Sequence, residues 1–148
     1  MVQIELVEQK KIEPTLTRKE WLKDPEVRKY LFFEDRITLE DGANSLVNFQ
    51  KYYEIHQYGR HVGDIKVFYE TEEDIFEQRA QILMIVGERN QGIGKAALKL
   101  LLEKLGETYK CVYCIIQRSN IASLKMLKHN GFEIEKFDDQ QIKLSRSL

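Results

Sequence analysis

Two glycines and two basic residues in the middle of the chain have the spacing of an anion-binding loop. The segment Arg89-Asn90-Gln91-Gly92-Ile93-Gly94-Lys95 follows an apolar run, 80–86, and opens an amphipathic stretch, 93–105. Glycine allows the backbone to approach a ligand closely, and the free N–H groups and dipole at a helix start favour a phosphate. The order of strand, glycine-rich turn and helix therefore predicts a site for a phosphorylated ligand.

Two common phosphate-binding motifs fit this segment poorly. A Walker A loop has a glycine where Arg89 stands and a hydroxyl residue, which holds magnesium, where Ala96 stands. The stretch 92–97 matches the Rossmann pattern G-x-G-x-x-[GA], but that fold also places an acid at the end of the next strand. The next predicted strand ends in Gln117-Arg118, without an acid.

A third pattern matches in two separate segments of the chain. Arg89-x-x-Gly92-x-Gly94 resembles the [QR]-x-x-G-x-[GA] motif of the Gcn5-related N-acetyltransferase (GNAT) family. Downstream, Asn120-Ile121-Ala122-Ser123 and then Gly131-Phe132 are similar to its second motif, N-x-x-[AS] followed by G-F. Upstream, 21–27 is similar to the opening of the branch that acetylates ribosomal-protein N-termini and some aminoglycosides, and the hairpin that ends at 62–64 resembles the family's second and third strands. The resemblance covers most of the chain.

The resemblance implies an acetyl-CoA-dependent N-acetyltransferase that transfers an acetyl group directly to a primary amine. That amine would belong to a small cationic molecule, an aminoglycoside or a protein N-terminus. The strand before the loop would pair its backbone with pantetheine, and one of its N–H groups would face the thioester oxygen. The cofactor-binding residues that the resemblance implies are Ile82, Leu83, Met84, Arg89, Asn90, Gln91, Gly92, Ile93, Gly94, Lys95 and Asn120. The amide of Asn120 would bond pantetheine, cap a helix, or do both.

The catalytic acid and base of the family are not recognisable. Leu127 stands where many relatives have a tyrosine, and Ile115 stands where the ribosomal branch has a glutamate. Glu77 is a candidate base and Ser123 a candidate proton donor, although a solvated carboxylate and a packing position explain them equally well. An alternative function is a non-catalytic acyl-CoA-binding sensor or interaction module.

An acidic run precedes the strand at 80–86. We expect the run to form a loop near the substrate entrance, where it would attract a cationic amine, or else to be an ordinary solvated loop. Its members are Glu70, Glu72, Glu73, Asp74 and Glu77.

The two cysteines, Cys111 and Cys114, have C-x-x-C spacing. They lie in a predicted buried strand, where residues three apart point to opposite faces. A redox pair would begin a helix, and a zinc site would require a second pair of ligands. We therefore expect structural thiols, and no metal site, since His56, His61 and His129 are scattered singly.

The composition is that of an ordinary globular protein. The 148 residues are 43% hydrophobic and 32% charged with a net charge of −1, which predicts one domain over 1–148 with neither nucleic acid nor membrane as a partner. The absence of a signal-peptide pattern or long apolar run predicts a cytoplasmic protein. Dimers are common in the family, so a homodimer is possible.

Hydrophobic periodicity predicts the elements that must position these residues. Helices are expected after a cap at Thr17, from Pro25, over 39–51, over 93–105 and over 120–130. Strands are expected over 2–7, 52–58, 61–69, 80–86, 111–117, 132–135 and 141–144. This order indicates an α/β (α+β) fold. Together with the resemblance, it predicts a single GNAT-like domain with a mixed, mostly antiparallel central sheet of about six to seven strands flanked by helices.

Overall fold

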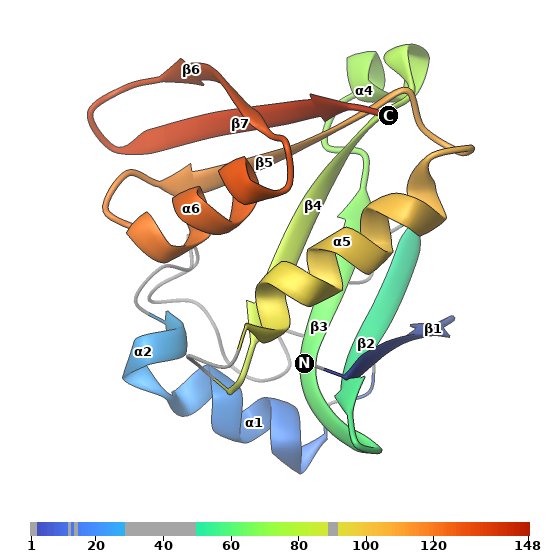
Figure 1. The fold of residues 1–148 in the computed structure, drawn as a ribbon, viewed down its shortest axis with the longest axis vertical. Coiled ribbons are helices and arrows are strands. Elements are labelled where there is room, and N and C mark those ends of the chain that lie inside the picture. Colours follow the sequence, from blue (N-terminus) through green and yellow to red (C-terminus); the bar gives the residue numbers. More distant parts are fainter. Residues whose placement is uncertain (1–2, 12, 14, 29–49, 89–91) are drawn as a thin grey trace.

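The computed structural model describes residues 3–11, 13, 15–28, 50–88 and 92–148. Its centre is a seven-stranded sheet in the order β1-β2-β3-β4-β5-β7-β6 (Figure 1). All neighbouring strands are antiparallel except β4 and β5, which are parallel. The strands are β1 (Ile4–Gln9), β2 (Lys51–Gln57), β3 (Arg60–Phe68), β4 (Arg79–Val86), β5 (Cys111–Gln117), β6 (Glu133–Phe137) and β7 (Gln141–Ser147). The predicted mixed sheet is confirmed.

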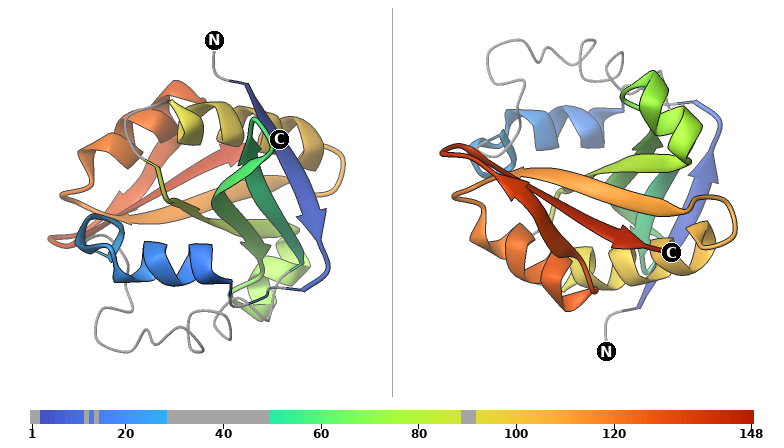
Figure 2. Two further views of the ribbon diagram at one scale, coloured as in Figure 1. Left: turned by 90° about the horizontal axis from the view of Figure 1, so that it is seen from below. Right: turned by 90° about the horizontal axis from the view of Figure 1, so that it is seen from above.

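Helices cover both faces of the sheet. The helices α5 (Ile93–Leu105) and α6 (Ile121–His129) lie on one face, and α1 (Leu16–Lys23) and α2 (Pro25–Arg28) lie on the other (Figure 2). The short helix α4 (Glu72–Glu77) lies where β4 begins. The apolar stripe of α5 packs on the sheet and forms the main core with β2 to β5. Its buried residues are Ile93, Ala97, Leu98, Leu101, Leu102 and Leu105.

The parallel ladder between β4 and β5 is short. It joins only Arg79 to Cys111, Ala80 to Val112 and Gln81 to Tyr113. After this seam, within the described part of the chain, β4 pairs only with β3 and β5 pairs only with β7. We call the region between the diverging segments 82–86 and 114–117 the wedge.

Three predicted features require correction or lie outside the described residues. All of the acidic run except Glu70 lies in helix α4 and not in a loop. Thr71 caps this helix by accepting from the Asp74 N–H, and Glu72, Glu73 and Asp74 stand in its first turn. The cap of α1 is Thr15 rather than Thr17, with the Arg18 N–H donating to the threonine hydroxyl. Most of the helix expected over 39–51 lies outside the described residues, and Lys51 begins β2.

The cysteines behave as structural thiols. Both are free, with Cys114 buried and Cys111 half-buried on β5. Burial raises the pKa of the Cys114 thiol to about 12, so this sulfur stays protonated at neutral pH and does not act as a nucleophile. Within the part of the chain that the structure describes, no helix is long and apolar enough to cross a bilayer.

Candidate functional site

The wedge opens in the middle of the sheet. Central strands are normally covered on both faces, yet the residues Leu83–Val86 and Ile115–Gln117 are only half-buried. Their accessibility follows from the separation of β4 from β5, which leaves a position where another extended group can lie beside β4. Unpaired backbone groups inside a protein require a partner, so the wedge is suited to a ligand with amide groups.

The direction of the β4 backbone defines what such a ligand meets. The Gly87 N–H donates to the Val62 carbonyl oxygen at 2.8 Å, toward β3. Backbone groups alternate between the two neighbours along a strand, so the N–H and C=O of Leu83 also point to β3. The N–H and C=O of Met84 and Val86 point into the wedge, where no strand among the described residues receives them.

The glycine-rich loop ends at the start of α5, next to the wedge. Gly92 caps this helix with a φ of 70°, a left-handed conformation that favours glycine, and no side chain bonds the cap. The first intrahelical bond runs from the Ala96 N–H to the Gly92 carbonyl at 3.2 Å. The N–H groups of Ile93, Gly94 and Lys95 therefore remain available to an anion. Residues 89–91, which include the predicted Arg89, Asn90 and Gln91, lie outside the described residues.

Gly94 allows α5 to approach its neighbours. A Cβ atom at this position would lie 2.9 Å from the Met126 Sδ on α6 and 3.6 Å from the Met84 Sδ on β4. The absence of a side chain thus brings the start of α5, the end of β4 and helix α6 together. Four of the predicted cofactor residues, from Gly92 to Lys95, open α5 at this junction, where Gly94 lies against β4.

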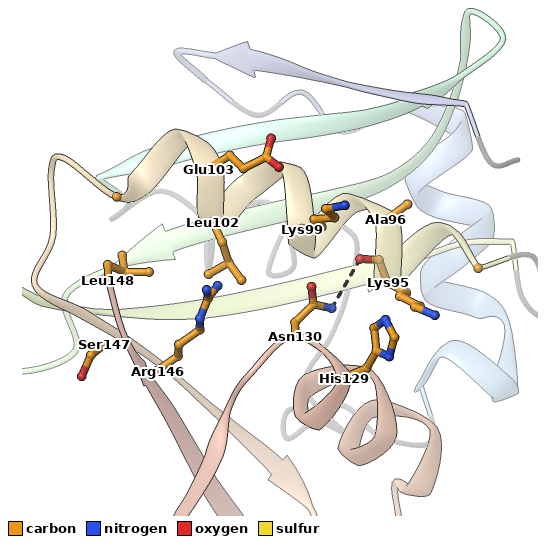
Figure 3. Close-up of a pocket in the computed structure, with 12 residues that line it drawn as sticks. Lys95, Ala96, Lys99, Leu102, Glu103, His129, Asn130, Arg146, Ser147 and Leu148 are labelled. Atoms are coloured by element: carbon orange, nitrogen blue, oxygen red, sulfur yellow. Dashed lines mark hydrogen bonds between the residues drawn. The ribbon is translucent and has the colours of Figure 1, made fainter.

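A basic groove runs from Gly92 along the side of α5 that faces the end of α6 and β7 (Figure 3). Its volume is about 840 Å³. Lys95 and Lys99 line it from α5, and His129 and Arg146 line it from α6 and β7. Among the described residues, Glu103 is the only acidic side chain that lines it. The Asn130 side-chain amide donates to the Lys95 carbonyl at 3.4 Å and ties the end of α6 to the first turn of α5.

Asn120 caps α6. Its Oδ1 accepts from the Ser123 N–H at 3.2 Å, while its Nδ2 has no partner among the described residues. The predicted capping role is therefore present, and the amide can still donate to a second group. Ser123 is half-buried in the first turn of α6, on the same side of the sheet as α5.

Glu77 lies at the opposite end of β4 from the glycine loop. It is exposed at the end of α4, two residues before β4 begins. Within the acidic run, Asp74 is buried because its Oδ2 accepts from the Tyr113 hydroxyl at 2.6 Å and from the Glu70 N–H at 3.1 Å. The structure therefore does not bring Glu77 and Ser123 together, and it uses Asp74 to attach α4 to β5.

A buried charge cluster, made by Arg18, Glu54, Asp64, His56 and His61, attaches α1 to the sheet. The Arg18 guanidinium donates to both oxygens of Asp64, at 2.8 and 3.1 Å, and to Glu54 Oε2 at 2.8 Å. His61 contacts Asp64 at 2.7 Å, His56 contacts Glu54 at 2.9 Å, and the two rings stack 5.5 Å apart. The predicted scattering of these two histidines is therefore wrong, although no group of metal ligands occurs among the described residues.

Both carboxylates of the cluster are held ionised. Burial by itself opposes the ionisation of Asp64, but hydrogen bonds from His61 and Arg18 outweigh it and lower the pKa of this carboxyl. Burial also opposes the ionisation of Glu54, where His56, His61 and Arg18 together lower its pKa. The cluster is thus a fixed set of charges beneath the end of β4. The sequence gives a sign of buried charge here, because Asp64 and Lys66 interrupt the otherwise apolar stretch 62–68.

Comparison with known proteins identifies the family of this chain. The family model described as "Acetyltransferase (GNAT) family" matches residues 8–132 of the chain. The chain belongs to the GNAT acetyltransferase family. The resemblance noted in the sequence is confirmed, and the seven-stranded sheet flanked by helices is that of a GNAT domain. No curated protein matches the chain.

Solved structures of N-acetyltransferases share this GNAT fold at low sequence identity. Spermidine N-acetyltransferase from Vibrio cholerae, solved with CoA and spermine, has a TM-score of 0.78 at 12% identity, covering 98% of this chain and 95% of its own. RimL, a ribosomal L7/L12 alpha-N-protein acetyltransferase in complex with coenzyme A, has a TM-score of 0.76 at 13% identity, covering 98% and 94%. The Campylobacter jejuni N-acetyltransferase PseH, in complex with acetyl coenzyme A, has a TM-score of 0.66 at 15% identity, covering 98% of this chain and 99% of its own.

Proposed function

We propose that this chain is an acetyl-CoA-dependent N-acetyltransferase that acts on a primary amine. The observation that carries the proposal is the wedge together with the anion-binding start of α5 at its end. The wedge exposes the backbone of Met84 and Val86, which suits the amides of pantetheine. The free N–H groups after Gly92 suit a pyrophosphate.

The basic groove supports the same ligand. Lys95, Lys99 and Arg146 place positive charge along one continuous surface from Gly92, where a further phosphate of coenzyme A would lie. Arg89 is expected to add to this charge. Several observations thus agree on one ligand that carries amides at one end and phosphates at the other.

Acetyl-CoA would supply an acyl carbon that a neutral amine attacks, so that a C–N bond forms and the C–S bond breaks. The proton that the nitrogen loses balances the thiolate that leaves, and the products are the acetamide and free coenzyme A. The Met84 N–H points into the wedge and would donate to the thioester oxygen, where negative charge develops. The Asn120 Nδ2 would donate to a pantetheine carbonyl while its Oδ1 continues to cap α6.

The candidates for proton transfer remain Glu77 and Ser123. The exposure of Glu77 on α4 suits contact with solvent or a bulky acceptor, and its acidic neighbours would attract a cationic amine. Ser123 lies in the first turn of α6, and α6 lies on the same side of the sheet as α5. This position suits contact with the thiol end of the ligand. Positioning of the two reactants also contributes to rate without any acid or base.

Two measurements test the proposal. Isothermal titration calorimetry should show that acetyl-CoA binds, and that Lys99→Met weakens binding more than Lys128→Met, which removes an exposed lysine of α6 outside the groove. A thiol-release assay should then show amine-dependent formation of free coenzyme A. Absence of acetyl-CoA binding would contradict the proposal. Binding without release for peptides, polyamines and aminoglycosides would favour the non-catalytic sensor.

A further inference from the structure

Two buried polar atoms on β4 have no hydrogen-bond partner among the described residues. They are Nε of Arg79, which is a donor, and Oε1 of Gln81, which is an acceptor. Leaving such a group unsatisfied costs about 1–3 kcal/mol, and native proteins keep few of them. A pair of this kind in one short segment marks a place where a bound water or ligand would supply the missing partners.

The two side chains lie on the same face of the sheet. Residues two apart on a strand share a face, and Ile85, which has the same parity, packs against Trp21 and Val27 on the α1 side. Ile82 and Met84 instead pack in the core beneath α5. The cofactor phosphates would bind on the α5 side of the sheet. Arg79 and Gln81 therefore lie on the opposite face from the phosphates.

Gln81 also marks the apex of the wedge. It is the last residue of β4 that pairs with β5. Three residues at about 3.3 Å each separate it from Met84, whose N–H points into the wedge. If the cofactor lies as proposed above, its thioester oxygen bonds the Met84 N–H and its acyl group points along the wedge toward Gln81, on the side where an acceptor would bind.

The surroundings hold Arg79 in a fixed position. Its Nη2 bonds Glu135, which also pairs with Lys143 at 3.1 Å. Its guanidinium lies over the Tyr113 ring, 4.9 Å from the centroid, and Lys143 lies 4.5 Å from the same ring. The free Nε–H is thus a pre-organised donor on a guanidinium that is otherwise engaged.

We propose that Arg79 and Gln81 bind the acyl acceptor, and that this acceptor is an α-amino carbonyl compound such as a peptide N-terminus. The Gln81 oxygen accepts an N–H of the amine and aligns its lone pair with the acyl carbon. The Arg79 Nε–H donates to the carbonyl oxygen beside the amine. A polyamine offers donors only and satisfies just one of the two atoms. This inference rests on the proposed transferase function and adds the class of acceptor.

Matched acceptors and variants test the inference. We measure kcat/KM for alanyl-peptide amide, isopropylamine (which lacks the carbonyl), spermidine and an aminoglycoside. The wild-type protein should prefer the peptide over isopropylamine by at least tenfold, the loss expected for about one hydrogen bond. Arg79→Lys keeps the charge beside Glu135 but loses Nε, so this preference should fall toward one. Gln81→Met should lower kcat/KM at least tenfold for every amine, whereas Gln140→Met, in the exposed β6–β7 turn, should not.

Two further readouts separate the possible failures. The urea midpoint of Gln81→Met should equal or exceed that of the wild type, because the variant removes an unpaired oxygen, so lost activity would not reflect unfolding. Calorimetry with coenzyme A present should show weaker peptide binding to Arg79→Lys than to the wild type, without any turnover. If acetyl-CoA binds and amines are acetylated, but spermidine is preferred or the variants leave the preference unchanged, this inference alone fails. If acetyl-CoA does not bind, both proposals fail.

Discussion

Replacing Arg18 by methionine tests whether the buried charge cluster attaches α1 to the sheet. The substitution keeps the apolar stem but removes five hydrogen bonds, to Asp64 (two), Glu54, the Tyr52 hydroxyl and the Glu13 carbonyl. Asp64 then remains buried without its cation. Breaking a buried pair in this way costs about 3–5 kcal/mol, so we expect urea unfolding to shift by about 2 M if each molar of urea changes stability by about 2 kcal/mol.

The loss of stability in Arg18→Met should depend on pH, and the direction of that dependence follows from the two carboxylates. In the wild type the pKa values of Asp64 and Glu54 are lowered, so their contribution to stability is full above the ordinary carboxyl pKa and is lost as pH falls through the lower folded values. In Arg18→Met, burial remains as the main influence on Asp64 and opposes its ionisation. The difference in stability between wild type and variant should therefore be largest at pH 7 and should shrink toward pH 4.

Lys19→Met is the matched control, since it removes the same charge from the next, half-exposed position of α1. It should change stability by less than about 0.5 kcal/mol. A loss below about 1 kcal/mol in Arg18→Met, or a difference from the wild type that grows on acidification, would refute the assignment of α1 docking to this cluster.

Three other predictions follow from single contacts. Gly87→Ala should cost about 1–3 kcal/mol in urea unfolding, because its Cβ would lie 2.0 Å from the Trp21 Nε1; an equal cost in a Trp21→Leu background would contradict this cause. Thiol labelling at pH 8, followed by mass spectrometry, should modify Cys114 only after unfolding, because burial raises its pKa to about 12, and rapid labelling of the folded protein would be inconsistent with that burial. Asn120→Ala should lose about 0.5–2 kcal/mol of stability, whereas Asn120→Ser should recover the cap but not the acetyl-CoA affinity; full affinity in the serine variant would limit Asn120 to capping.

Much of the fold could be predicted because its signals are local. Strand alternation located the β2–β3 hairpin and the final β6–β7 pair, and the apolar spacing located α5. The ends of α6 were also readable, since Asn120 caps the helix and Gly131, with a φ of 85°, follows its last turn. The glycine loop was predicted for the same reason, because the need for positive φ is written in the residue type.

The remaining features depend on contacts distant in sequence. Arg18 has the appearance of a solvated helix residue until β2 and β3 place Glu54 and Asp64 against it. The high charge of the acidic run predicts a loop, because it hides the capping role of Thr71. The length of the β4–β5 ladder depends on two strands that are separated by α5, and no local pattern states that pairing stops at Gln81. For the same reason the orphan atoms of Arg79 and Gln81 were invisible in the sequence.

The three-residue seam between β4 and β5 has a consequence for motion. It is the only ladder between the antiparallel group β1 to β4 and the antiparallel group β5 to β7 in the described sheet. Amides on each side of it can therefore exchange with solvent in separate subglobal openings, since cooperative units often coincide with supersecondary motifs. A ligand that fills the wedge would bond both strand groups at once. Its binding would therefore join two units that open independently into one cooperative unit.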